Sequence, residues 1–80
     1  MKKELYKNMA VNSTLAKETI IKVLTHYPVC TTKEIAKFAW QAYGVDMTLA
    51  SVSSQLRLMR STAKIGSSKN EYGATVYWLN

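Results

Sequence analysis

Two amphipathic helical patterns stand close together in the middle of the chain and are joined by a short turn. Thr31 and Glu34 have the spacing of a capping box, in which two side chains satisfy backbone donors at a helix start. This spacing predicts a helix over Thr32–Tyr43. Gly44 stands where a helix ends on a left-handed residue, and Thr48 is suited to cap a following helix. Two helices joined by so short a glycine-containing turn indicate a helix-turn-helix.

The second of these patterns, Met47–Ile65, has two contrasting faces when its residues are placed 100° apart. Its apolar stripe consists of Leu49, Val52, Leu56, Met59 and Ala63. Its opposite face is small or cationic and consists of Ala50, Ser53, Ser54, Arg57, Ser61 and Lys64. No acidic residue occurs from Met47 to Asn70, whereas an ordinary solvated helix mixes Glu with Lys. We interpret the segment as a helix that enters the major groove of DNA. A buried helix with a solvated back is the alternative.

A helix and a hairpin flank this pair. Asn12, Ser13 and Thr14 are N-cap candidates for a first helix that runs to about Tyr27, where Pro28 stops it. Its apolar stripe is expected to be Ala16, Ile20, Val23, Leu24 and Tyr27. The second helix is expected to bury Ile35, Phe38 or Ala39, and Ala42. Val29 and Cys30 make a short extended link. Towards the C-terminus, Lys64–Ser67 and Ala74–Leu79 predict two strands around a turn-rich segment.

Composition limits the class of protein and of partner. The chain has 80 residues, enough for one small domain, and a formal net charge of +6, which favours nucleic acid, an acidic protein or a membrane surface. Cys30 is the single cysteine, so no internal disulfide forms and a reducing compartment is expected. No apolar run is long enough to span a bilayer, and the basic start lacks the apolar core of a signal peptide. These features predict a cytoplasmic protein without membrane partners.

Three stretches resemble a winged helix-turn-helix domain over roughly residues 14–79. TTKEIAKFAWQAYG resembles its second helix, TLASVSSQLRLMRSTAKI its reading helix and IGSSKNEYGATVYWL its wing. VSSQLRLM is similar to a segment of MarR-like regulators, and YGATVYWL resembles the small fimbrial-operon regulators of the PapI and FaeA type. Thr62 and Ala63 stand where a glycine often precedes the wing. The resemblance implies an α+β, mainly α fold: a three-helix bundle with a C-terminal β-hairpin wing over residues 12–80, preceded by an arm over residues 1–11.

The same resemblance implies that the third helix docks in the major groove and that the wing contacts the backbone or minor groove. The candidate DNA-binding residues are Lys33, Ser51, Ser53, Ser54, Gln55, Arg57, Arg60, Ser61, Lys64, Lys69 and Asn70. Arg57 is suited to guanine and Gln55 to adenine, since both can bond a base edge twice. The serines suit phosphates or base edges, and the remaining candidates suit phosphates. Lys33 would act with the free amides at the start of its helix.

The sequence gives little support for metal binding, catalysis or single-strand binding. His26 has no Cys or His partner at ligand spacing, and no set of side chains suggests catalysis, so neither a metal, a cofactor nor an enzyme activity is expected. Trp40, Tyr43, Tyr77 and Trp78 fit burial better than a stacking platform for single strands. Trp40 lies off the main stripe and, if exposed, would mark a protein interface.

We therefore expect a small transcriptional regulator that binds specific double-stranded DNA. One reading helix recognises few base pairs, so a homodimer or a partner regulatory protein is expected to assist. A winged-helix module that binds protein, such as an anti-repressor or polymerase-binding factor, and a non-specific architectural DNA-binding protein are the alternatives.

Overall fold

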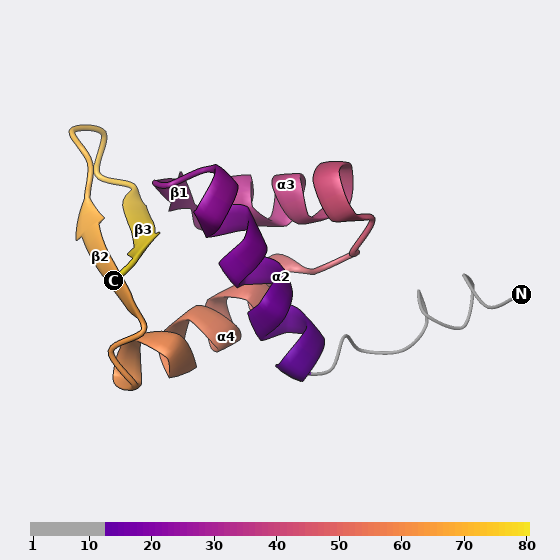
Figure 1. The fold of residues 1–80 in the computed structure, drawn as a ribbon. Coiled ribbons are helices and arrows are strands. Elements are labelled where there is room, and N and C mark those ends of the chain that lie inside the picture. Colours follow the sequence, from indigo (N-terminus) through magenta and orange to yellow (C-terminus); the bar gives the residue numbers. More distant parts are fainter. Residues whose placement is uncertain (1–12) are drawn as a thin grey trace, which may run out of the picture.

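The computed structural model describes residues 13–80. The arm expected over residues 1–11 and the expected domain start at residue 12 lie outside the described residues. The elements are α2 (Ser13–His26), β1 (Cys30–Thr31), α3 (Thr32–Tyr43), α4 (Leu49–Ser61), β2 (Ile65–Lys69) and β3 (Thr75–Leu79). The three helices pack across one another, and the strands lie at the side of the bundle where α3 begins and α4 ends (Figure 1). Within residues 13–80 no helix is long and apolar enough to cross a bilayer.

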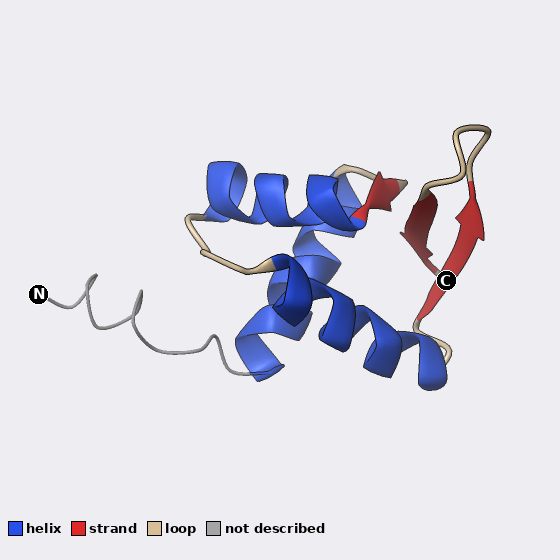
Figure 2. Cartoon of the chain, turned by 180° about the vertical axis from the view of Figure 1, so that it is seen from behind, coloured by secondary structure: helices blue, strands red, loops and turns tan. Residues whose placement is uncertain are grey.

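Local capping fixes the bounds of α3. The backbone N–H of Glu34 donates to Thr31 Oγ1 at 3.2 Å, and the N–H of Thr31 donates to Glu34 Oε1 at 2.9 Å. This is the predicted capping box, and it confirms the start of the helix. At the other end Gly44 has a φ of 66°, and its N–H donates to the carbonyl of Trp40 at 3.0 Å. The left-handed residue ends α3 and turns the chain toward α4 (Figure 2), as the sequence predicts.

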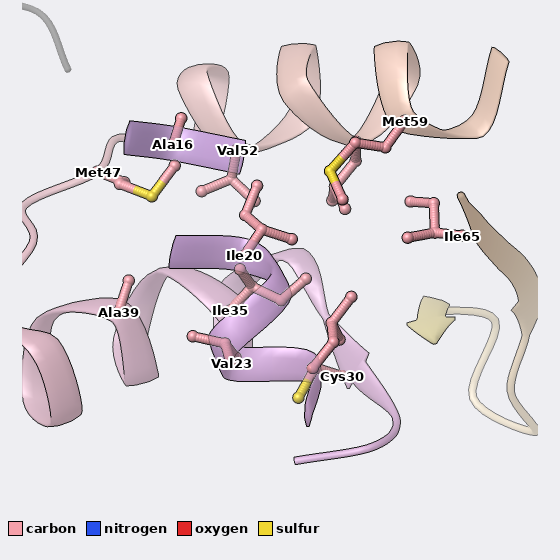
Figure 3. Packing of buried hydrophobic residues seen from close by; sticks show 12 residues of the cluster. Ala16, Ile20, Val23, Cys30, Ile35, Ala39, Met47, Val52, Met59 and Ile65 are labelled. Carbon is pink, nitrogen blue, oxygen red and sulfur yellow. The ribbon is translucent and has the colours of Figure 1, made fainter. Parts of the chain in front are cut away.

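The core lies where the three helices cross. Ile20 of α2, Ile35 of α3 and Val52 of α4 are fully buried, and their side chains meet at its centre (Figure 3). The predicted stripe of α2 is confirmed for Ala16, Ile20, Val23 and Leu24, which are all buried. It is wrong for Tyr27, because the helix ends at His26. The Tyr27 ring, 37 % exposed, instead stacks on Phe38 with 4.0 Å between the ring centroids.

The core-facing side of α3 differs in one residue from the prediction. Ile35 and Ala39 are buried, and Phe38 packs against them half-buried. Ala42 is exposed, so the expectation that it is buried is wrong. Near Ala42, the core is contacted by two larger side chains of the same helix, Phe38 and Tyr43.

The stripe of α4 is shorter than predicted. Val52, Leu56 and Met59 are buried, but Leu49 is 47 % exposed. Met47, the residue before the N-cap, fills the core in place of Leu49 and points toward Ala16 (Figure 3). A buried residue before the cap, paired with the residue five positions on, is the arrangement of a hydrophobic staple.

The C-terminal end of α4 also departs from the prediction. The helix ends at Ser61, so Ala63 and Lys64 lie outside it. Ala63 has a φ of 59°, which turns the chain away from the helix axis and into β2. The prediction that Ala63 belongs to the apolar helical stripe is therefore wrong.

The sheet has three antiparallel strands in the order β1-β3-β2. Tyr77 and Leu79, which alternate along β3, pack against the core, so their side of the strand is the inward one. Trp78 lies opposite Gly66 of β2, and a Cβ at Gly66 would come within 2.5 Å of the indole nitrogen. The glycine thus makes room for the tryptophan ring on the outer face of the hairpin.

Candidate nucleic-acid interface

The outer face of α4 is open to solvent. Ala50, Ser53, Ser54, Arg57 and Ser61 are all exposed. The helix start is fixed by Thr48, whose Oγ1 accepts from the backbone N–H of Ser51 at 3.0 Å, as the sequence predicts. Residues 13–80 therefore leave this face uncovered.

The predicted serines differ in what they offer a ligand. The hydroxyl of Ser51 accepts a hydrogen bond from Thr48 Oγ1 at 3.0 Å, and its side chain is half-buried. Ser61 donates its hydroxyl hydrogen to the carbonyl of Leu58 at 2.7 Å. Ser53 and Ser54 stand exposed on the middle of the face. These two are the serines best placed to donate to a ligand.

Gln55 is not part of this surface. Its side chain is 7 % exposed, because it follows Val52 by three residues and precedes Met59 by four, on the side of α4 that faces the core. The prediction that Gln55 reads adenine is wrong for this reason. Helical spacing within the segment does not show how closely the other elements pack against this part of α4.

The cations gather toward the end of α4. Arg57 and Arg60 are exposed on the helix, and Lys64 follows the turn at Ala63. Lys64 lies beside Lys17 of α2, and this contact and the repulsion between the two ammonium groups lower the pKa of Lys64. Lys17 was not among the predicted site residues. Its outward position on the first helix is visible in the sequence, but its proximity to Lys64 is not.

The wing carries Lys69 at the end of β2 and Asn70 in the turn. Asn70 Oδ1 accepts from the backbone N–H groups of Tyr72 at 2.9 Å and of Ala74 at 3.0 Å. The oxygen of Asn70 therefore shapes the turn, which leaves its amide nitrogen for a ligand. Glu71 and Tyr72 are exposed at the tip, Tyr72 at 86 %.

Lys33 belongs to a different secondary-structure element from the other candidate residues. It is exposed in the first turn of α3, directly after β1, whereas the other candidates belong to α4, the turn that follows it and the wing. Trp40, on the same helix, is 54 % exposed. The expectation that Trp40 fits burial is wrong.

Cys30 and His26 form no site within residues 13–80. The thiol of Cys30 donates to the carbonyl of Tyr27 at 3.2 Å, and burial, with a smaller effect of the Glu34 charge, raises the pKa of Cys30 to about 11. The thiol is therefore protonated at neutral pH and acts as a small core group. In the same part of the chain no three His, Cys, Asp or Glu side chains gather where they could hold a metal ion.

Comparison with known proteins identifies the fold. No protein-family model and no curated protein sequence matches the chain. Among solved structures, the chain is similar to the ferric uptake regulator (Fur) of Vibrio cholerae, a protein with DNA-binding domains, with a TM-score of 0.73 and 20 % identity. The match covers all of this chain and 62 % of the Fur chain. The fold is a winged helix-turn-helix. The predicted fold class is thus confirmed, and the closer resemblance to MarR-like or PapI-like regulators stays a prediction.

Proposed function

We propose that this winged-helix domain binds double-stranded DNA and belongs to a transcriptional regulator. In this proposal α4 lies in the major groove, and the hairpin of β2 and β3 follows the neighbouring backbone. The observation that carries the proposal is the exposed, acid-free outer face of α4, which presents Ser53, Ser54 and Arg57 beside a cationic end. The fold shared with Fur, a regulator with DNA-binding domains, supports it.

Each exposed side chain has a role that its chemistry suits. Arg57 is the candidate for guanine, because its guanidinium group can bond the two acceptors of that base in the major groove. Arg60, Lys64 and Lys69 are candidates for phosphates, and the amide nitrogen of Asn70 is another. Ser53 and Ser54 project from the same face and suit phosphates or base edges.

Lys17 joins the candidates for phosphate contact. Its ammonium group lies beside that of Lys64, and the two charges repel each other. A phosphate placed between them would convert this repulsion into two attractions. The pair therefore extends the proposed backbone contact from α4 onto α2.

A second molecule is expected to take part in specific binding. The domain has one reading helix, and a single helix reads only a few base pairs. A second copy of this chain on a neighbouring half-site, or a partner regulatory protein, would supply the remaining contacts. The chain spans about 62 % of the length of the Fur chain that it matches.

A titration of fluorescent duplex DNA followed by anisotropy tests the proposal. A site is first selected from a random-sequence library, and binding is then measured at several salt concentrations. We expect the logarithm of the association constant to fall with the logarithm of salt by about 0.9 per phosphate contacted. Absence of binding at low salt, or binding that does not respond to salt, contradicts the proposal.

Two variants localise the contact. Arg57→Ala is expected to weaken binding to the selected site by about tenfold or more and to relax the base preference at one position. Lys22→Ala is the control, because it removes the same charge from α2, where the ammonium lies 5.8 Å from the centre of the Tyr43 ring. Equal losses in the two variants would show that net charge, and not the face of α4, determines binding.

The exposed Trp40 favours a second candidate function, binding of a protein partner through α3. The same titration separates the two, since a purely protein-binding module shows no salt-dependent affinity for random or selected duplex. An architectural DNA-binding protein would show the salt dependence without preference for the selected site.

A further inference from the structure

Leu58 is the most exposed large apolar side chain of α4, more exposed than Leu49 at the start of the helix. Leu58 is 57 % exposed, while its neighbours in the apolar stripe, Leu56 and Met59, are 1 % exposed. It follows Arg57 directly and comes one helical turn after Ser54, so it borders the outer face. Within residues 13–80 more than half of this side chain is open to solvent, so packing of these residues does not require a leucine here.

The two hydroxyl groups that follow Leu58 on the helix bond to carbonyls of the helix itself. The hydroxyl of Ser61 donates to the carbonyl of Leu58 at 2.7 Å, and the hydroxyl of Thr62 donates to the carbonyl of Met59 at 3.1 Å. These hydrogens are therefore used within the end of the helix. Leu58 is therefore an exposed apolar side chain directly after Arg57, on a segment without acidic residues.

We propose that Leu58 contacts the 5-methyl group of a thymine and is a specificity-determining residue; this rests on the proposed DNA binding. The major groove exposes hydrogen-bonding groups on every base but only one apolar group, the methyl of thymine. The occupant is inferred from charge, because the cations that flank Leu58 favour a polyanion over an apolar protein surface. Arg57 and Leu58 are adjacent on the helix, so the site should hold a guanine and a thymine within about two base pairs.

The test replaces thymine by deoxyuridine in the duplex, which removes the methyl group and leaves base pairing intact. In the site selected from the library, each thymine is replaced in turn and the affinity of the protein is measured by anisotropy. Wild-type protein is expected to bind about fourfold more weakly when the contacted thymine is replaced, the loss for one buried methyl-sized group. Replacement of distant thymines is expected to change nothing.

Variants of the protein, combined with the deoxyuridine duplexes, form a double-mutant cycle. Leu58→Ala is expected to bind the thymine duplex about fourfold more weakly and to lose its sensitivity to deoxyuridine. Leu58→Met keeps an apolar side chain of similar volume and should retain that sensitivity. Val29→Ala is the matched control, because Val29 is an equally exposed aliphatic residue (58 %) on the segment before β1. The unfolding midpoint of each variant confirms that the fold is intact.

The outcomes separate the two proposals. If no duplex is bound, the proposed function fails and the inference fails with it. If the selected duplex is bound but no deoxyuridine replacement weakens wild-type binding, the contact with thymine is refuted while DNA binding stands. The same holds if Leu58→Ala remains as sensitive to deoxyuridine as the wild type.

Discussion

The turn between α4 and β2 holds an alanine in a backbone conformation that suits glycine. Ala63 has a φ of 59°. Its N–H donates to the carbonyl of Arg60 at 3.0 Å, and the N–H of Lys64 donates to the carbonyl of Met59 at 2.9 Å. These two bonds form a Schellman motif, in which the left-handed residue is usually glycine. Asn80 adds a third bond, from its side-chain nitrogen to the carbonyl of Ala63 at 2.9 Å.

Ala63→Gly is expected to stabilise the protein. The left-handed conformation costs an L-residue about 1–2 kcal/mol, and glycine avoids this cost. Glycine also has more conformational freedom in the unfolded chain, which lowers the free energy of unfolding by about 0.4–1 kcal/mol. The expected gain in the free energy of unfolding is therefore about 0.5–1 kcal/mol, which for a domain of this size raises the melting temperature by about 2–8 °C.

Thermal and urea denaturation followed by circular dichroism measure this gain. Ala42→Gly is the matched control, because Ala42 is an exposed residue in the last turn of α3, where glycine should cost about 0.5–1 kcal/mol. Opposite signs in the two variants support the reasoning. If Ala63→Gly leaves the stability unchanged or lowers it, the strain assigned to Ala63 is refuted.

Three further predictions concern the hairpin and the buried thiol. Gly66→Ala is expected to lower the free energy of unfolding by about 1–3 kcal/mol, because the added Cβ would come within 2.5 Å of the Trp78 indole, and tryptophan fluorescence should change with it. Asn70→Ala removes the acceptor of two backbone hydrogen bonds at the wing tip and should cost about 1 kcal/mol in urea denaturation, with faster hydrogen exchange at Ala74. Cys30 is expected to make stability fall in alkaline solution: its contribution is complete below pH 9.0, where the unfolded thiol ionises, and is lost as the pH rises through about 11.

Each of these has its own control. Ser68→Ala, on the same strand as Gly66 but opposite Val76 and not opposite Trp78, should leave tryptophan fluorescence unchanged. Asn70→Asp keeps an oxygen acceptor and should retain most of the turn's stability, and a loss as large as that of Asn70→Ala would contradict the role given to the oxygen. Because lysine and tyrosine also titrate in alkaline solution, the effect of Cys30 is the difference between the wild type and Cys30→Ala, and equal slopes against pH would refute it.

The bounds of α3 could be predicted because local chemistry sets them. Thr31 and Glu34 cap α3 through side chains three residues apart, and Gly44 ends it in the left-handed conformation that glycine favours. The predictions that the structure corrects concern residues whose burial depends on contacts with distant parts of the chain. Met47 takes the place of Leu49 in the core, beside Ala16 of α2 (Figure 3), and no pattern within the segment shows which of the two residues faces inward.

The candidate interface shows the same division. The exposure of Ser54 and Arg57 follows from their place opposite the buried stripe, so helical periodicity alone was enough to predict it. The burial of Gln55 depends on how closely the other elements pack against its side of α4. Helical periodicity locates the edge of the buried face only to within about one residue. The contact between Lys17 and Lys64 needs the fold of three helices and the turn at Ala63 to exist at all. The surface proposed to bind DNA thus depends on the sequence of one helix and on the turn that directs the chain from that helix into the wing.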